Sequence, residues 1–243
     1  MLLVNVDDFG WNKKITDKIL TCFVEKRIHF ASAMTFMADS ERAAELAHET
    51  HLPVGLHLNL DEELTGLQAP EKLREHHQNT AAYLKARKWN QVLYNPLLRN
   101  SFDYVFQAQW DEFCRLYGAT PKRLDGHRHM HLCMNILLSG KIPKGICVRR
   151  NFTFYSGEKN PINRLYRYLV DRWLQLHFIC TDSFFCMTPL NRGKPLREKL
   201  QRPLLLSKST NVEILFHPGI ENEYSFLLSP EWLEIISHAN ESF

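Results

Sequence analysis

The chain has 243 residues, of which 44% are hydrophobic and 23% are charged. These proportions exclude a disordered chain and a coiled coil, and the length suits one large α/β domain or two small ones. The net charge of +3 is too small to indicate nucleic acid as a partner. We expect no transmembrane segment and a cytoplasmic location, because no apolar stretch reaches about 18 residues and no basic leader opens the sequence.

Short apolar segments alternate with longer amphipathic ones, a pattern typical of βα units around a mostly parallel sheet. The predicted strands cover residues 2–6, 31–36, 54–60, 122–125, 146–149, 178–183 and 212–216. The predicted helices cover residues 15–25, 40–50, 102–117, 161–176 and 230–240. We therefore predict a single α/β domain over 1–243, folded as a distorted or incomplete TIM-like (β/α) barrel. A doubly wound open sheet is the alternative.

Two segments depart from this regular pattern. Residues 61–100 are polar, contain Pro70 and Pro96, and have only moderate helical periodicity, so we predict an inserted segment that acts as a lid or substrate loop. Between Lys141 and Arg172, eight basic residues stand against two acidic ones. This excess indicates either a solvated surface or a basic lip beside a pocket for an anionic or lipid-linked substrate.

Titratable side chains lie where four predicted strands end. Asp7 and Asp8 follow the first strand, His57 lies on the third, His127 follows the strand at 122–125, and His217 follows the last. The carboxyl ends of parallel strands share one rim, which is where TIM-type barrels carry their chemistry. We therefore expect these side chains to meet around one ion.

The aspartate pair and His57 can each also be explained without a metal ion. Asp7 and Asp8 would repel one another unless a cation lay beside them, although an Asx turn with Gly10 at positive φ would also explain the pair. Strict alternation over 55–60 puts His57 and Asn59 on the same face of a strand. Asn59 is then placed to orient the imidazole or to contact substrate, whereas a core histidine is the alternative for His57.

The segment Asp-Gly-His-Arg-His-Met-His at 125–131 is the strongest signal. In an extended chain it puts Asp125, His127, His129 and His131 on one side. Burying three imidazoles without partners is costly, but positions four residues apart are about 13 Å apart and cannot all bind one ion. We expect one ligand, with the other side chains beside it or in contact with substrate. A surface histidine run is the alternative.

Taken in order, these motifs resemble the YdjC-like carbohydrate deacetylases, the chitooligosaccharide deacetylase family. The matching segments are Asp-Asp-Phe-Gly at 7–10, Gly-Leu-His-Leu at 55–58, the histidine segment at 125–131 and Phe-His-Pro-Gly at 216–219. The resemblance covers nearly the whole chain. It implies a distorted TIM-like barrel, one divalent cation held by an aspartate and two histidines, and removal of N-acetyl groups from amino sugars. Gly126 stands where family members often carry serine.

Carried over by position, the resemblance implies metal ligands at Asp8, His57 and His127. It implies a general base at Asp7 and a proton donor or oxyanion support at His217. A cation with three protein ligands keeps positions open for water and for the substrate carbonyl. Two imidazoles and a carboxylate suit Zn²⁺, and such an open site also accepts Mg²⁺, so the expected cofactor is one divalent ion, Mg²⁺ or Zn²⁺.

Other functions fit part of the pattern. A metal-dependent phosphoester hydrolase would hold two ions, and a 2-His-1-carboxylate oxygenase would hold iron. An inactive sugar-binding module is the non-enzymatic alternative. The partners to consider are an N-acetylated sugar, a lipid-linked substrate reached by peripheral membrane contact, and a second copy of the chain in a homodimer. The six cysteines contain no Cys-x-x-Cys pair, which favours reduced thiols over a zinc ribbon.

Overall fold

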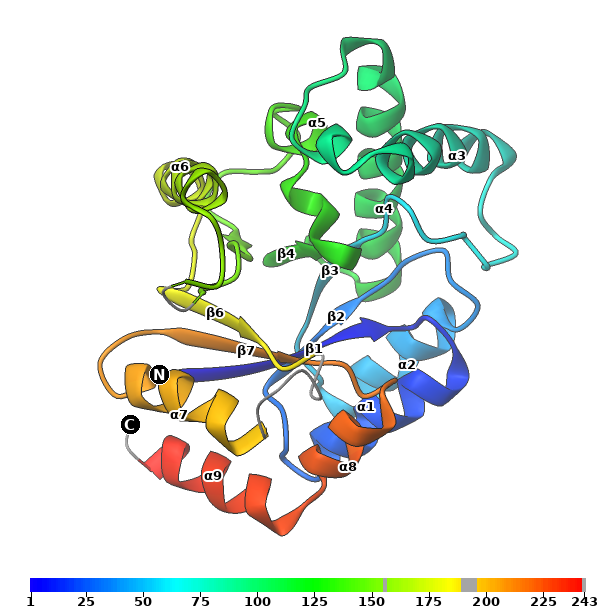
Figure 1. Cartoon of the computed structure of the whole chain (residues 1–243). Helices are drawn as coiled ribbons and strands as arrows, with labels where there is room; N and C mark the ends of the chain where they lie inside the picture. The colour runs from blue at the N-terminus through cyan, green and yellow to red at the C-terminus, as the bar shows by residue number, and fades with distance from the viewer. Residues whose placement is uncertain (155–156, 189–195, 242–243) are drawn as a thin grey trace.

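The computed structural model describes residues 1–154, 157–188 and 196–241, and it shows one curved parallel sheet with helices around it (Figure 1). Seven strands form the sheet in the order β5-β4-β3-β2-β1-β7-β6. They are β1 (Leu2–Phe9), β2 (Phe30–Ala33), β3 (Val54–Leu58), β4 (Arg123–Gly126), β5 (Cys147–Val148), β6 (Ser183–Cys186) and β7 (Val212–Phe216).

The first half of the chain contributes α1 (Lys13–Val24), α2 (Ser40–Thr50), α3 (Glu71–Ala86), α4 (Arg99–Tyr117) and α5 (Met134–Leu137). The second half contributes α6 (Pro161–His177), α7 (Leu196–Ser207), α8 (Glu221–Leu227) and α9 (Pro230–Glu241). Three short 3₁₀ helices are η1 (Lys88–Gln91), η2 (Pro96–Leu98) and η3 (His127–Leu132).

The centre of the sheet is buried on both faces, as expected for a parallel sheet covered by helices. All five residues of β7 are buried, and seven of the eight residues of β1 are buried. Among the described residues the sheet does not close through a continuous ladder, because β5 meets the segment before β6 through an isolated bridge between Cys147 and Ile179. The predicted fold class, an incomplete TIM-like α/β barrel in a single domain, is confirmed.

The inserted segment at 61–100 contains more regular structure than its periodicity indicates. Sixteen of its residues form α3, which starts after Pro70 and buries Leu73 and Leu84. Pro96 occupies the first turn of η2, where its missing N–H costs nothing. Helical structure, rather than a long irregular loop, therefore connects β3 to α4.

The strand predicted at 178–183 is misplaced. The backbone N–H of Phe178 bonds to Leu174 O, so the chain is still leaving α6 at this point. Only Ile179 makes a bridge, and β6 begins at Ser183. In the apolar Phe-Ile-Cys segment before the strand, Phe178 and Cys180 are partly buried, whereas Ile179 is exposed. The helices α7 and α8 were not predicted.

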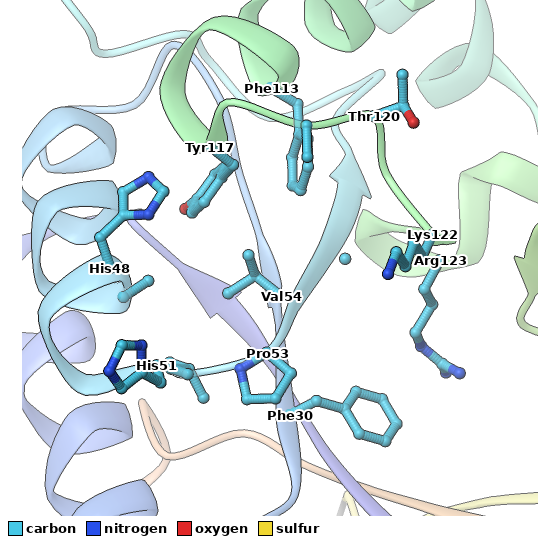
Figure 2. A pocket seen from close by; sticks show the side chains of 14 residues that line it. Phe30, His48, His51, Pro53, Val54, Phe113, Tyr117, Thr120, Lys122 and Arg123 are labelled. Atoms are coloured by element: carbon cyan, nitrogen blue, oxygen red, sulfur yellow. The ribbon is translucent and has the colours of Figure 1, made fainter.

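A cavity of about 530 Å³ opens at the amino ends of β2, β3 and β4 (Figure 2). Phe30, Val54 and Arg123 line it, and each lies at the start of its strand. The clustered aspartates and histidines lie at the opposite, carboxyl ends. None of the described helices combines the length and the apolar character needed to cross a membrane.

Candidate metal centre

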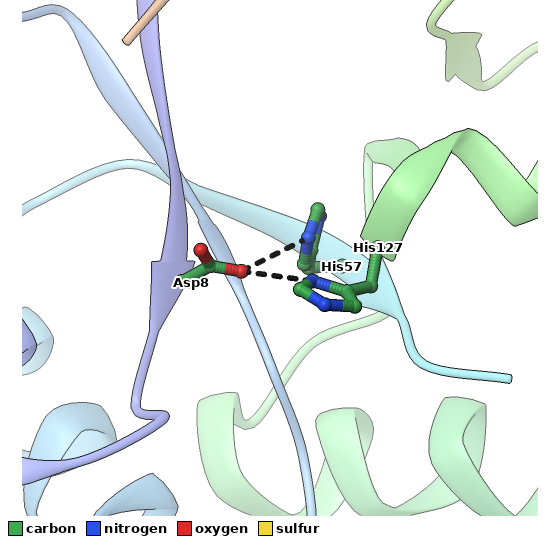
Figure 3. A group of neighbouring side chains, drawn as sticks. All are labelled: Asp8, His57 and His127. Atoms are coloured by element: carbon green, nitrogen blue, oxygen red, sulfur yellow. Dashed lines mark hydrogen bonds and ion pairs between the residues drawn. The ribbon is translucent and has the colours of Figure 1, made fainter. Parts of the chain in front are cut away.

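Asp8, His57 and His127 come together from three strand ends (Figure 3). Oδ1 of Asp8 lies 3.4 Å from Nε2 of His57 and 3.1 Å from Nδ1 of His127. One ligand atom from each side chain lies within 4.8 Å of the others, and all three residues are buried. An aspartate and two histidines in this arrangement fit a single divalent cation.

A backbone irregularity brings both neighbouring carboxylates to the same side. Strand alternation alone would point Asp7 and Asp8 to opposite faces. The register of β1 with β2 shifts between Val6 and Phe9, and Asp8 has φ of 72°. As a result, Oδ2 of Asp7 lies 3.9 Å from His57 Nε2, close to the Asp8 oxygen. Such strain in a non-glycine residue is typical of functional sites.

Asp125 orients His57. The Nδ1–H of His57 donates to Asp125 Oδ1 at 2.7 Å, which leaves Nε2 directed at Asp8. Asp125 Oδ2 in turn accepts a hydrogen bond from Ser32 Oγ at 2.6 Å. Burial disfavours the charged imidazole, but Asp7, Asp125 and Asp8 outweigh it and raise the pKa of His57 to about 10. The surrounding aspartates therefore favour a positive charge next to Nε2. A metal ion bound to a neutral His57 would supply that charge.

Arg149, one of the eight basic residues between Lys141 and Arg172, is buried at the centre of this cluster. Its Nη1 and Nη2 bind the two carboxylate oxygens of Asp7 at 2.8 Å each. Burial alone would raise the pKa of Asp7, but Arg149 and His57 lower it to about 2. Arg149 also contacts Asp125 at 2.9 Å and Glu213 at 2.8 Å. The sequence feature that pointed to Arg149 was its position as a charged residue at the end of the predicted strand 146–149.

The buried charges of this cluster do not balance. Four carboxylates are buried against two guanidiniums, so two negative charges remain with a neutral His57 and one remains with a protonated His57. These groups are Asp7, Asp8, Asp125 and Glu213, with Arg123 and Arg149. Uncompensated buried charge is costly, and a bound divalent cation would neutralise it.

The prediction of an extended histidine segment is wrong. After His127 the chain turns into η3, and Arg128 and His129 have φ of 51° and 60°. A Cβ on Gly126 would lie 2.9 Å from the backbone nitrogen of His131, so the tight return favours glycine here. The three imidazoles consequently point in different directions instead of sharing one side.

The remaining imidazoles and Asn59 have separate contacts. His131 Nε2–H donates to the backbone oxygen of Arg149 at 2.9 Å, and burial lowers the pKa of His131 to about 4. The ring of His129 packs edge-on against Phe152, with centroids 4.2 Å apart. Asn59 stabilises the turn after β3, because its Oδ1 accepts from Glu62 N–H at 2.8 Å.

His217 faces Asp7 from the end of β7, with its Nε2 4.0 Å from Asp7 Oδ2. Its Nδ1 lies 2.8 Å from Thr188 Oγ1, which also donates to Glu223. Glu223 is fully buried and accepts the backbone N–H of His217 at 2.7 Å. Burial lowers the pKa of His217, but Glu223, Asp7 and Asp8 give a net increase. Nothing in the sequence pattern had singled out Thr188 or Glu223.

Two curated relatives match part of this chain. A carbohydrate deacetylase from Danio rerio is 30% identical over 138 residues, which are 56% of this chain and 43% of that protein. A chitooligosaccharide deacetylase from Proteus mirabilis is 28% identical over 137 residues, 56% of this chain and 52% of that protein. The chain thus spans about half the length of the curated relatives it matches.

A solved structure from Enterococcus faecalis V583, named for cellobiose-phosphate cleavage, has the same fold. It superimposes with a TM-score of 0.66 at 17% identity, over 98% of this chain and 94% of that one. The family model described as YdjC-like protein matches residues 1–238. The chain therefore belongs to the YdjC-like family.

Proposed function

We propose that this protein is a metal-dependent deacetylase that removes the N-acetyl group from an amino sugar by hydrolysis. The observation that carries the proposal is the meeting of Asp8, His57 and His127 beside the ionised carboxylate of Asp7. The relatives named as carbohydrate and chitooligosaccharide deacetylases support the substrate class.

The proposed cofactor is one divalent cation, held by Asp8, His57 and His127. When bound, it supplies Lewis acidity that polarises the amide carbonyl and favours ionisation of water. Two imidazoles and one carboxylate suit Zn²⁺, and Mg²⁺ is the second ion to test. Asp125 holds His57 by its Nδ1, so that Nε2 is the free ligand atom.

The proton steps belong to Asp7 and His217 in this proposal. Asp7 accepts the proton of the attacking water, and Arg149 keeps its carboxylate ionised and fixed. His217 donates a proton to the departing amine, because Glu223 and the nearby aspartates favour its charged form. Nε2 of His217 lies 4.0 Å from Oδ2 of Asp7, so both groups lie within reach of the same reacting amide in this proposal.

A second ion is not favoured at the other possible cluster, Asp7, His57 and Asp125. This group shares His57 with the first, and both of its carboxylates already bind Arg149. A cation placed there would compete with a buried guanidinium. We therefore favour amide hydrolysis with one ion over a two-metal phosphoester hydrolase.

We further propose that the inserted segment 61–100 helps to hold the sugar. A cavity of about 650 Å³ lies beside η3, between η1 of this segment and α6. Trp89, Arg128, His129, Asn151 and Tyr166 are among its lining residues. Cavities of this size hold small molecules, and exposed aromatic rings suit the apolar faces of sugars.

The test is an acetate-release assay on N-acetylglucosamine and its β-linked oligomers. The purified chain should release acetate with added Zn²⁺ or Mg²⁺ and should lose this activity with a chelator. Release of phosphate from phosphorylated sugars, without acetate release, would instead identify a phosphoester hydrolase.

A further inference from the structure

Helix α6 exposes an apolar face that neither the fold nor the proposed chemistry uses. Its residues lie at helical spacing on one side of the helix. They are Ile162, Leu165, Tyr168, Leu169 and Leu176, and the first and last are 80% and 76% exposed. In Figure 1, α6 lies at the margin of the molecule, apart from the other labelled helices. This set is called the α6 apolar face below.

The opposite side of α6 is anchored to the protein. Val170 and Leu174 are buried in the core. Asn163 and Tyr166 line the 650 Å³ cavity beside η3. The helix starts in a defined way, because the Asn160 side chain accepts the backbone N–H of Asn163 at 2.8 Å. The α6 apolar face is therefore presented to the outside by a fixed helix.

The exposed charged side chains of α6 itself have one sign. Arg164 and Arg172 are exposed on α6. Asp171 is the one carboxylate of the helix, and it is buried and binds Arg150 Nη2 at 2.7 Å. An apolar helix face accompanied by arginines, with no exposed carboxylate on the helix, matches a surface that is both apolar and negatively charged.

We propose that α6 docks this protein on an anionic lipid surface. The α6 apolar face would enter the boundary between headgroups and acyl chains, while Arg164 and Arg172 contact the anionic headgroups. A second copy of the chain is less suitable, because a symmetric pair would bring Arg164 and Arg172 of both copies together without an exposed α6 carboxylate. Docking would place the cavity beside η3 next to the bilayer, on the other side of the same helix.

Vesicle sedimentation tests the proposal independently of any enzymatic activity. The full chain should sediment with vesicles of phosphatidylglycerol and phosphatidylcholine, should bind phosphatidylcholine alone much more weakly, and should dissociate at high salt. The double variant Leu165→Glu, Leu169→Glu should lose binding. Arg164→Gln with Arg172→Gln should weaken it roughly 30-fold.

Leu205→Glu is the matched control, because Leu205 is 66% exposed on α7, away from α6. Circular dichroism and thermal unfolding verify that each variant is folded. The proposal is overturned if the wild-type chain does not bind the anionic vesicles, or if the leucine variant binds as well as Leu205→Glu. It is equally overturned if sedimentation velocity shows a dimer that the leucine variant dissociates, since the face would then be a contact between copies.

Discussion

Arg149 holds both carboxylate oxygens of Asp7 at 2.8 Å, inside the half-barrel and directly beside the histidine cluster. This contact lowers the pKa of Asp7, together with His57, to about 2. It also fixes the direction of the carboxylate. The proposed base is therefore ionised at neutral pH, although so low a pKa also makes it a weak proton acceptor.

Replacing Arg149 with lysine should change the acid side of the pH profile. Lysine keeps one positive charge but cannot bind both oxygens of Asp7 in parallel. The pKa of Asp7 should rise, so activity should disappear at a higher pH than in the wild type as the pH falls. The pH dependence of kcat/KM measures this shift. Arg150→Lys is the control, because Arg150 binds Asp171 outside the cluster. An unchanged acid limb in Arg149→Lys would show that Asp7 does not limit the rate.

Asp7→Asn should abolish turnover and leave the metal in place. The amide has nearly the size of the carboxylate but cannot accept the proton of water, and general-base catalysis contributes roughly 10²–10⁴-fold. Metal content by elemental analysis and acetate release are measured on the same preparation. If the variant loses its metal, Asp7 is a ligand and the assignment of the base is wrong.

His57→Ala and His127→Ala should each lower the bound metal to well under one ion per chain. Each removes one of three proposed ligands, and His57→Ala also leaves Asp125 without its imidazole partner. His131→Ala is the contrasting variant, since His131 bonds to the backbone of Arg149 rather than to Asp8. Metal stoichiometry that stays at one in either ligand variant refutes that ligand.

Glu223→Gln should move the alkaline side of the activity profile. Glu223 raises the pKa of His217, and a proton donor works only below its own pKa. Removing the negative charge lowers that pKa, so activity should fall at a lower pH than in the wild type as the pH rises. An alkaline limb that does not move would separate His217 from the proton transfer.

The meeting of Asp8, His57 and His127 could be predicted because strand ends of a parallel sheet share one rim. The positions of these residues relative to their strands followed from local hydrophobic pattern alone. Glu223 could not be found in this way, and Arg149, although it lies at the end of the predicted strand 146–149, gave no indication of its contact with Asp7. Arg149 contacts Asp7, which lies 142 positions earlier, and Glu223 on a helix accepts the backbone N–H of His217 at a strand end. The periodicity of a sequence does not predict such contacts.

The histidine segment shows a different limit of the sequence. Its alternation predicts an extended chain, but Arg128 and His129 adopt left-handed backbone conformations that α and β propensities do not describe. Tertiary contacts stabilise this turn, since Arg128 binds Asp61 at 2.6 Å and Glu62 at 2.7 Å. The pattern therefore predicted that one histidine of this segment lies at the cluster, where His127 is found, and misplaced the two histidines after it.

Trp89→Ala should raise KM for oligosaccharides more than for the monosaccharide. Trp89 is 71% exposed and lines the cavity beside η3, so its ring is available to a sugar next to the reacting one. Loss of one such contact should raise KM for diacetylchitobiose about tenfold, with little change in kcat. Calorimetric titration with the same sugars measures binding without turnover.

Leu97→Ala is the control, because Leu97 is 91% exposed on η2 of the same segment and does not line this cavity. Trp89→Phe should recover most of the affinity, since it keeps a flat apolar ring. Equal KM changes for monomer and dimer would place the oligosaccharide elsewhere on the rim.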